Sequence, residues 1–229
     1  MDDSLKSELV EHLKSFVTEE RLHLFEEKIN LRSRKLTLVL EDVFQSRNIS
    51  AAMRSADCFG LQDIHIIENK NEFISDKTVS LGAGKWLNII HHNKKENNTA
   101  DCIKNLKKEG YQVIATTPHK SNISLDKIDI KNNNIAILLG TELTGLSEEA
   151  LNLSDKRLKI DMYGFTESLN ISVSAAICCQ NLSNKMRKEN NSWKINEEEK
   201  TDILLEWLRN TIKASVQIEE EFLKRKCKI

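Results

Sequence analysis

Three short segments of this chain combine residues that can bind an anion or hold a small polar ligand. They span residues 48–54, 140–145 and 167–170. The first carries an arginine on a mostly apolar stretch, and the second has a glycine at each end. The third contains Glu, Ser and Asn within four residues. Arginine recognises phosphate and carboxylate groups, and glycine lets backbone N–H groups approach a ligand closely.

Arg54 is the side chain in these segments with the most pronounced chemistry. It follows Ile49, Ala52 and Met53 on the same predicted helix, which begins at Asn48. An arginine beside an apolar face is costly unless it is paired or directed at an anion. The alternative is a solvent-facing arginine whose aliphatic stem lies along Met53.

Two glycine-rich turns allow a similar pair of interpretations. Residues 140–145 read Gly-Thr-Glu-Leu-Thr-Gly, and residues 82–85 read Gly-Ala-Gly-Lys. The 140–145 turn lacks the G-x-G-x-x-G pattern of dinucleotide sites and the lysine of a Walker loop. It can present backbone N–H groups to a ligand, or it can be an ordinary turn between a strand and a helix. Residues 82–85 can contact a phosphate or form a plain loop.

The segment of residues 167–170 runs directly into a helix-like stretch of small and apolar residues, 171–179. Polar side chains at a helix start usually cap its free N–H groups, and this is the simpler interpretation of Ser168 and Asn170. Small residues in the helix, such as Ser172 and Ala175, allow another backbone or a second subunit to approach closely.

The order of the apolar runs places these segments on a parallel sheet. Strand, helix and strand alternate within about thirty residues, which indicates βαβ units and an α/β fold. Ligands bind such sheets at the carboxyl ends of the strands. We expect strands at residues 36–40, 64–67, 86–90, 111–115, 135–139 and 157–160, and helices at 4–30, from 48 to Gly60, at 99–109, from Ser147, from 171 and from about 197.

The composition limits the classes of protein to which this chain can belong. The 229 residues are 39% hydrophobic, with no run of membrane-spanning length and an acidic, non-signal-like N-terminus, so we expect a cytoplasmic protein. Five cysteines form no C-x-x-C pair and are best interpreted as reduced packing residues. The six histidines show no metal-type spacing, and the adjacent His91 and His92 would face opposite sides of a strand. The sequence therefore predicts no metal site.

The net charge of −1 does not indicate a nucleic-acid partner by itself. Basic residues do cluster before the first strand, after the helix of residues 171–179 and at the C-terminus. Such a cluster is either a solvated helix face or a phosphate-binding surface.

Read together, the three segments resemble the three ordered motifs of the SPOUT-class RNA ribose 2′-O-methyltransferases. The motifs are residues 48–56, 139–147 and 160–174. The TrmH branch, the tRNA guanosine 2′-O-methyltransferases, is the most similar. The resemblance covers residues from about 36 to 182, and it rests on three motifs in the right order and spacing.

The resemblance implies a parallel-sheet SPOUT fold whose C-terminal part threads through a loop as a trefoil knot. It implies S-adenosylmethionine as the cofactor, a homodimer with an active site shared between subunits, and no metal. By position, the residues that line the cofactor pocket are Thr116, Leu139, Gly140, Ile160, Met162 and Leu169.

The resemblance also assigns catalytic roles. Arg54 would contact the target ribose and its phosphate, Asn48 would orient the ribose, and Glu142, Ser168 and Asn170 would hold the geometry of the site. The family account makes the arginine the base, but a guanidinium does not normally give up its proton. We therefore expect the arginine to stabilise alkoxide charge while the proton leaves to phosphate or water.

The expected substrate is tRNA, at guanosine 18 of the D-loop. The predicted parts are an RNA-contacting helical extension (residues 1–35), the methyltransferase domain (36–190) and a C-terminal helical extension (191–229). Two alternatives stay open: a ribosomal-RNA 2′-O-methyltransferase, and a catalytically inactive RNA-binding SPOUT protein. The residues predicted to contact RNA are Arg21, Arg32, Arg34, Lys85 and Arg187.

Overall fold

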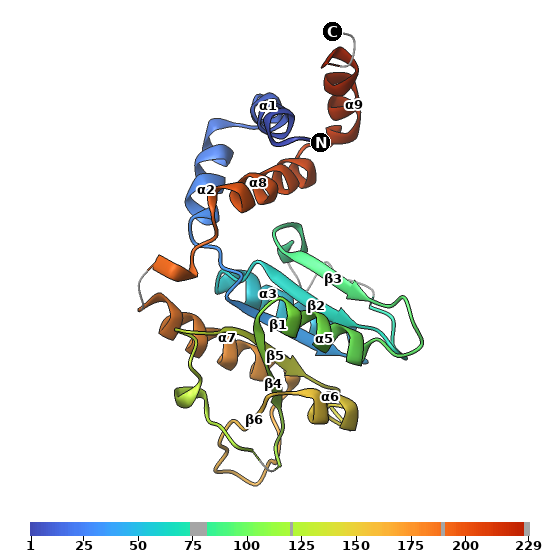
Figure 1. Ribbon diagram of the computed structural model, residues 1–229, viewed down its shortest axis with the longest axis vertical. Helices are drawn as coiled ribbons and strands as arrows, with labels where there is room; N and C mark the ends of the chain where they lie inside the picture. Colours follow the sequence, from blue (N-terminus) through green and yellow to red (C-terminus); the bar gives the residue numbers. More distant parts are fainter. Residues whose placement is uncertain (74–81, 120, 189–190, 227–229) are drawn as a thin grey trace. The chain divides into compact units, whose positions relative to one another are not determined.

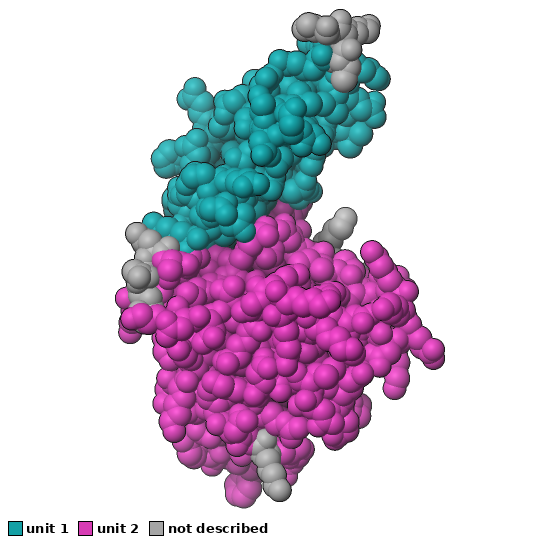
Figure 2. Space-filling view, in the orientation of Figure 1, with its two compact units in different colours: residues 1–32, 194–229 teal, residues 33–193 magenta. Residues whose placement is uncertain are grey.

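A computed structural model describes residues 1–73, 82–119, 121–188 and 191–226. The chain forms two compact units (Figure 2). One contains residues 33–193, and the other combines the N-terminal residues 1–32 with the C-terminal residues 194–229. None of the described helices is long and apolar enough to cross a membrane.

The unit of residues 33–193 is built on one six-stranded sheet in which all pairings are parallel (Figure 1). The strand order is β3-β2-β1-β5-β4-β6, so the direction of winding reverses between β1 and β5. The central strands are buried on both faces, as their unbroken apolar sequences predicted. The strands are β1 Leu36–Glu41, β2 Asp63–Ile67, β3 Asn88–His92, β4 Tyr111–Thr116, β5 Asn134–Leu139 and β6 Lys156–Leu158.

Helices cover both faces of this sheet (Figure 1). On one face α3 and α7 pack against each other and share an apolar core with β1 and β5. On the other face α5 and α6 cover a second apolar cluster. The bounds are α3 Ser46–Cys58, α5 Thr99–Lys108, α6 Glu148–Leu153 and α7 Ile171–Arg187, with short 3₁₀ helices η1 Ala83–Lys85, η2 Leu125–Lys127 and η3 Asn191–Trp193.

The structure confirms the predicted α/β parallel sheet and shifts some boundaries. The strand expected at residues 86–90 is β3, which begins at Asn88, because Trp86 instead ends the 3₁₀ helix η1. The helix expected from Asn48 begins at Ser46, which leaves Asn48 in its first turn with its side chain free for other contacts. Gly60 follows this helix with a left-handed φ of 77°, as expected for a residue that ends a helix. The trefoil knot stays a prediction.

In its described residues, the second unit has four α-helices: α1 Asp3–Lys14, α2 Glu19–Ile29, α8 Glu197–Thr211 and α9 Ser215–Lys226. Helix α8 packs against the other three. The core of this unit contains Leu9, Leu13 and Phe25 from the N-terminal helices and Trp207 and Leu208 from α8. We expected helical extensions at residues 1–35 and 191–229, and the α-helices of both belong to this one unit.

Candidate functional site

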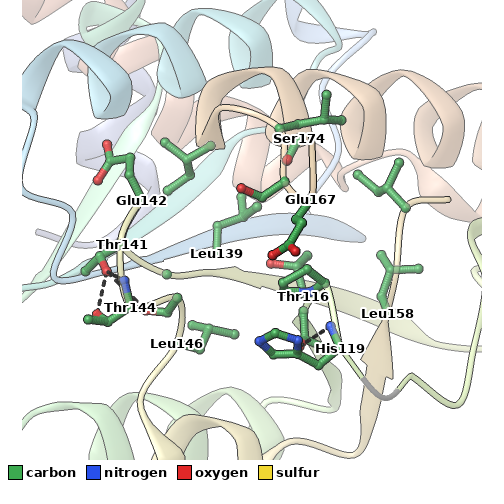
Figure 3. A pocket seen from close by; sticks show the side chains of 18 of the residues that line it. Thr116, His119, Leu139, Thr141, Glu142, Thr144, Leu146, Leu158, Glu167 and Ser174 are labelled. Atoms are coloured by element: carbon green, nitrogen blue, oxygen red, sulfur yellow. Dashed lines mark hydrogen bonds between the residues drawn. The ribbon is translucent and has the colours of Figure 1, made fainter. Parts of the chain in front are cut away.

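A cavity of about 290 Å³ opens at the carboxyl ends of β4, β5 and β6 (Figure 3). Its walls come from these strand ends, from the loops that follow them and from the start of α7. This is the edge at which open parallel sheets bind ligands. The six residues that the sequence assigned to a cofactor all line the cavity: Thr116, Leu139, Gly140, Ile160, Met162 and Leu169.

The cavity combines apolar walls with an acidic group. Leu139 and Leu158 are buried and form part of its apolar surface. Thr116 donates its hydroxyl to the carbonyl of Leu138 at 2.8 Å, so its methyl group is left for the cavity. The carboxylate of Glu167 points into the space between these groups (Figure 3). Such a cavity suits a ligand that has an apolar ring at one end and a cationic group at the other.

The loop of residues 140–146 forms one wall and is closed by its own hydrogen bonds. Thr141 and Gly145 exchange two backbone bonds of 3.0 and 3.1 Å, and the hydroxyls of Thr141 and Thr144 lie 2.7 Å apart. A Cβ atom at Gly140 would lie 2.2 Å from the carbonyl carbon of Gly145. The sequence left open whether these glycines make room for a ligand or form an ordinary turn. Gly140 instead makes room for the backbone of the same loop.

A chain of hydrogen bonds joins the three sequence segments at the rim of this cavity. The amide nitrogen of Asn48 donates to the carboxylate of Glu142. The amide nitrogen of Asn170 donates to the Oδ1 of Asn48 at 3.2 Å. Because Glu142 also lines the cavity, the three side chains bring α3, the 140–146 loop and the start of α7 together beside it.

Asn170 also caps α7. Its Oδ1 accepts hydrogen bonds from the backbone nitrogen of Ser172 at 2.8 Å and from the Ser172 hydroxyl at 2.6 Å. The capping interpretation is therefore confirmed for this residue, and its role in the site stays a prediction. One end of the amide fixes the helix start, and the other end fixes Asn48.

The remaining two residues with predicted catalytic roles differ in position. Ser168 lines the cavity from the loop before α7. Arg54 lies on α3 with its side chain exposed and is not among the residues that line the cavity. Within one chain, Arg54 therefore fits the solvent-facing alternative, and only an RNA or a second subunit could bring it into a site.

Two of the residues predicted to contact RNA belong to the four-helix unit. Arg32 is buried and lies over the indole of Trp207, 5.2 Å from the ring centroid, so it serves packing and not phosphate binding. Arg21 is exposed and lies 6.0 Å from the ring centroid of Phe25. This unit contains 16 acidic and 13 basic residues, so its net charge does not favour RNA.

The other three lie in the sheet unit. Arg187 stacks on Trp193 at 4.5 Å, and the guanidinium of Arg34 lies 3.6 Å from the carboxylate of Asp63. These two arginines are held by the fold, whereas Lys85 is exposed at the end of η1. Of the five predicted RNA contacts, the exposed side chains are therefore Arg21 and Lys85.

Some cavity residues escaped the sequence reasoning. His119 lines the cavity from the turn after β4, and its backbone nitrogen donates to the Thr117 hydroxyl at 3.2 Å (Figure 3). Leu158 and Ser174 line it from β6 and α7. The rule that ligands bind at the carboxyl ends of strands, applied to every strand, would have included His119.

Comparison with known proteins connects this geometry to a family. The model of the SpoU rRNA methylase family matches residues 35–180, which include the whole sheet and all three rim segments. The chain belongs to the SpoU methylase family. It is 42% identical over 212 residues to the tRNA (guanosine(18)-2′-O)-methyltransferase of Borreliella burgdorferi, which covers 93% of this chain and 94% of that protein.

Two further SpoU methylase relatives differ in how much of their length is matched. The 23S rRNA (guanosine-2′-O-)-methyltransferase RlmB of Xanthomonas axonopodis pv. citri is 29% identical, and the match covers 63% of this chain and 56% of that protein. The crystal structure of the A. aeolicus TrmH/SpoU tRNA modifying enzyme superposes with a TM-score of 0.75 at 27% identity. It covers 85% of this chain and 98% of that chain.

Proposed function

We propose that this protein transfers a methyl group from S-adenosylmethionine to the ribose 2′-oxygen of a tRNA guanosine, guanosine 18 in the D-loop. The observation that supports this most is the hydrogen-bonded chain Glu142–Asn48–Asn170, with Asn48 in the middle, on the rim of the cavity. It joins the three family segments at one place. The tRNA substrate is supported by the similarity to the Borreliella enzyme over nearly the whole of both chains.

The cavity fits S-adenosylmethionine in its chemistry. Leu139, Leu158 and Ile160 offer apolar surface for the adenine ring, and the carboxylate of Glu167 offers an opposite charge for the cationic groups. The cofactor supplies an electrophilic methyl group on a positively charged sulfur. The chain's task is then to hold the acceptor oxygen in line with that methyl group, since alignment contributes most to a displacement of this kind.

The rim residues provide the alignment. Asn48 is held from both sides, by Glu142 and by Asn170, so its position is fixed before RNA binds. We assign Arg54 to the ribose phosphate, where a guanidinium can form two parallel hydrogen bonds and stabilise charge on the 2′-oxygen. The proton of the 2′-hydroxyl leaves to a phosphate oxygen or to water as the new carbon–oxygen bond forms.

We propose a homodimer as the active form, in which Arg54 of one subunit serves the cavity of the other. Two features support this. Arg54 lies outside the cavity of its own chain, and the two loops that contain Glu142 and Glu167 carry apolar side chains that are almost fully exposed: Leu143, Tyr163 and Phe165. Exposed apolar groups gathered in one region usually mark an interaction surface.

For the substrate, we propose that the sheet unit carries catalysis and that the terminal helices guide the RNA. The charge balance of the four-helix unit limits this role to a few side chains such as Arg21. Recognition would then depend on the shape of tRNA more than on a broad basic surface. Since tRNA is modified in the cytoplasm, we place the protein there.

Two measurements test these proposals. In isothermal calorimetry, S-adenosylmethionine should bind; absence of binding heat at several temperatures would instead support an inactive RNA-binding protein that kept the fold. Methyl transfer should then be measured with a tRNA transcript and with a 23S rRNA fragment. We expect methylation of the tRNA alone, and preferential methylation of the rRNA fragment would support the ribosomal alternative.

A further inference from the structure

Two histidines and a cysteine meet on the face of the sheet opposite α3 and α7. His65 lies in β2, His92 ends β3, and Cys102 lies in α5. In the strand register His65 pairs with Ile90, so His92, two residues further along, is its diagonal neighbour on the same face. The Nδ1 of His65 lies 3.0 Å from the Nε2 of His92. The Sγ of Cys102 and one ring nitrogen of each histidine lie within 4.8 Å of one another.

These atoms form a set of donors that matches zinc. Zinc is bound in proteins by imidazole nitrogen and thiolate sulfur, and tetrahedral geometry places neighbouring donor atoms roughly 3.3–3.6 Å apart. The distance of 3.0 Å between the two nitrogens differs from this by a few tenths of an ångström. We propose that His65, His92 and Cys102 form a zinc site, with a fourth coordination position left for water.

The three donor side chains are largely removed from solvent. His65 and Cys102 are buried, and His92 is half-buried. Burial, and to a smaller extent the neighbouring His92, lower the pKa of His65 to about 4. Burial, and then the carboxylates of Glu109 and Glu41, raise the pKa of the Cys102 thiol to about 12. Because burial is the largest cause, the thiol keeps its proton in the metal-free protein, and zinc must displace that proton to bind the sulfur.

The donors are positioned by the fold before a metal arrives. The turn between β3 and α5 is fixed by Asn98, which is buried. Its backbone nitrogen donates to the side chain of Asn69 at 2.8 Å, and its amide nitrogen donates to the carbonyl of Lys95 at 2.8 Å. Helix α5, and therefore Cys102, is thus held in place against the edge of the sheet.

Binding has a defined proton balance. Zinc replaces the proton of the Cys102 thiol, which is released to solvent. The proton shared between the two rings is not released, because it moves to the outer nitrogen of its own ring. One proton should therefore appear in solution for each zinc bound. The alternative is a neutral histidine pair whose only link is the hydrogen bond between the rings.

The site is separate from the proposed active site, since none of its three residues lines the cavity. Its expected role is structural: it would clip the edge strand β3 to β2 and to α5. Sequence spacing concealed it, because the donors come from three elements and the histidines are 27 residues apart. As expected, His91 and His92 face opposite sides of β3, and of the two it is His92 that faces His65.

The test uses the full-length protein without a histidine tag, stripped by a chelator and then titrated with Zn²⁺ or with Co²⁺. We expect one metal ion per chain, one proton released per ion, and a thiolate-to-cobalt charge-transfer band. At a zinc concentration about 100-fold above Kd, Tm should rise by roughly 5–10 °C. A missing charge-transfer band, or metal uptake without proton release, would overturn the proposal.

Variants locate the site. Cys102→Ala and His92→Gln should each lose the cobalt band and the rise in Tm with zinc. His91→Gln is the matched control, because it changes the neighbouring residue of the same strand, whose ring contacts Glu68 at 2.7 Å instead. Circular dichroism and S-adenosylmethionine binding show whether each variant is folded. If the folded Cys102→Ala and His92→Gln proteins keep the cobalt band and the rise in Tm with zinc, the site is not formed by these residues.

Discussion

Two carboxylates in the sheet unit differ in their burial and in the number of hydrogen bonds that they accept. Glu41 ends β1 and is buried, and it accepts hydrogen bonds from the Thr99 hydroxyl at 2.6 Å and from the backbone nitrogen and hydroxyl of Ser147 at 2.9 and 2.7 Å. Glu142 is half-buried on the cavity rim, and among the described residues its recorded donor is Asn48.

The difference indicates what each carboxylate does. A buried carboxylate that accepts three hydrogen bonds has a structural role. Through these bonds Glu41 connects the starts of α5 and α6 to the end of β1. A half-exposed carboxylate with one donor keeps acceptor capacity for a substrate or for positioning a partner. We therefore expect changes at the rim to reduce activity and changes at Glu41 to reduce stability.

Arg54 should show the largest effect on activity. We expect Arg54→Ala to lower methyl transfer by roughly 10³-fold or more, because charge on the 2′-oxygen loses its stabilising cation. Cofactor affinity, measured by calorimetry, should stay nearly unchanged. Lys104→Ala, which removes an exposed cation from α5 on the opposite face, is the control and should be fully active. Equal loss of transfer and cofactor binding in Arg54→Ala would show that Arg54 is structural.

Glu142 comes next. Glu142→Gln keeps an acceptor for Asn48 but removes the charge, and we expect a loss of roughly 10²-fold in kcat. The free energy of unfolding should change by less than about 0.5 kcal/mol, as at other partly exposed positions. Denaturant unfolding and single-turnover transfer would measure the two quantities on the same sample. If Glu142→Gln lowered the free energy of unfolding as much as Glu41→Gln does, the two carboxylates would not differ in structural role.

Glu41→Gln tests the other side of the comparison. The amide cannot accept as many hydrogen bonds from Thr99 and Ser147, so we expect a loss of about 2 kcal/mol in stability. Transfer measured well below the new Tm should stay within a few-fold of the wild-type rate. If activity disappeared while the protein remained folded, Glu41 would belong to the catalytic machinery.

We expect the smallest loss of activity at Asn170, which both contacts Asn48 and caps α7. Asn170→Asp keeps the cap on α7 but loses the nitrogen that donates to Asn48, so Tm should be retained while kcat falls about tenfold. Asn170→Ala loses the cap as well and should cost a further ~1 kcal/mol of stability. Equal kcat in Asn170→Asp and wild type would show that the contact with Asn48 is not used in catalysis.

Most of the fold could be predicted from the sequence because its signals are local. The unbroken apolar run of β5 and the glycine after α3 depend only on neighbouring residues. Strand β3 was displaced by two residues, since its apolar start at Trp86 belongs to a 3₁₀ turn that the sequence does not mark.

Six of the residues that line the cavity were predicted from the sequence, but the contacts that connect the rim residues were not. The cavity residues follow strand ends, which a sequence can show, but the link from Asn48 to Glu142 joins residues 94 positions apart. The same limit applies to Arg32, whose stacking on Trp207 no local pattern indicates. Long-range pairing decides whether an arginine is free for RNA or held in the core.

In the proposed reaction, the cavity holds the methyl donor and the rim residues position one ribose oxygen of tRNA to accept the methyl group. The most direct test compares two tRNA transcripts that differ only at guanosine 18, one with its 2′-hydroxyl and one with 2′-deoxyguanosine. With labelled S-adenosylmethionine, the first should accept one methyl group on that ribose and the second none. Equal labelling of both transcripts, or a methyl group on a base, would contradict the account.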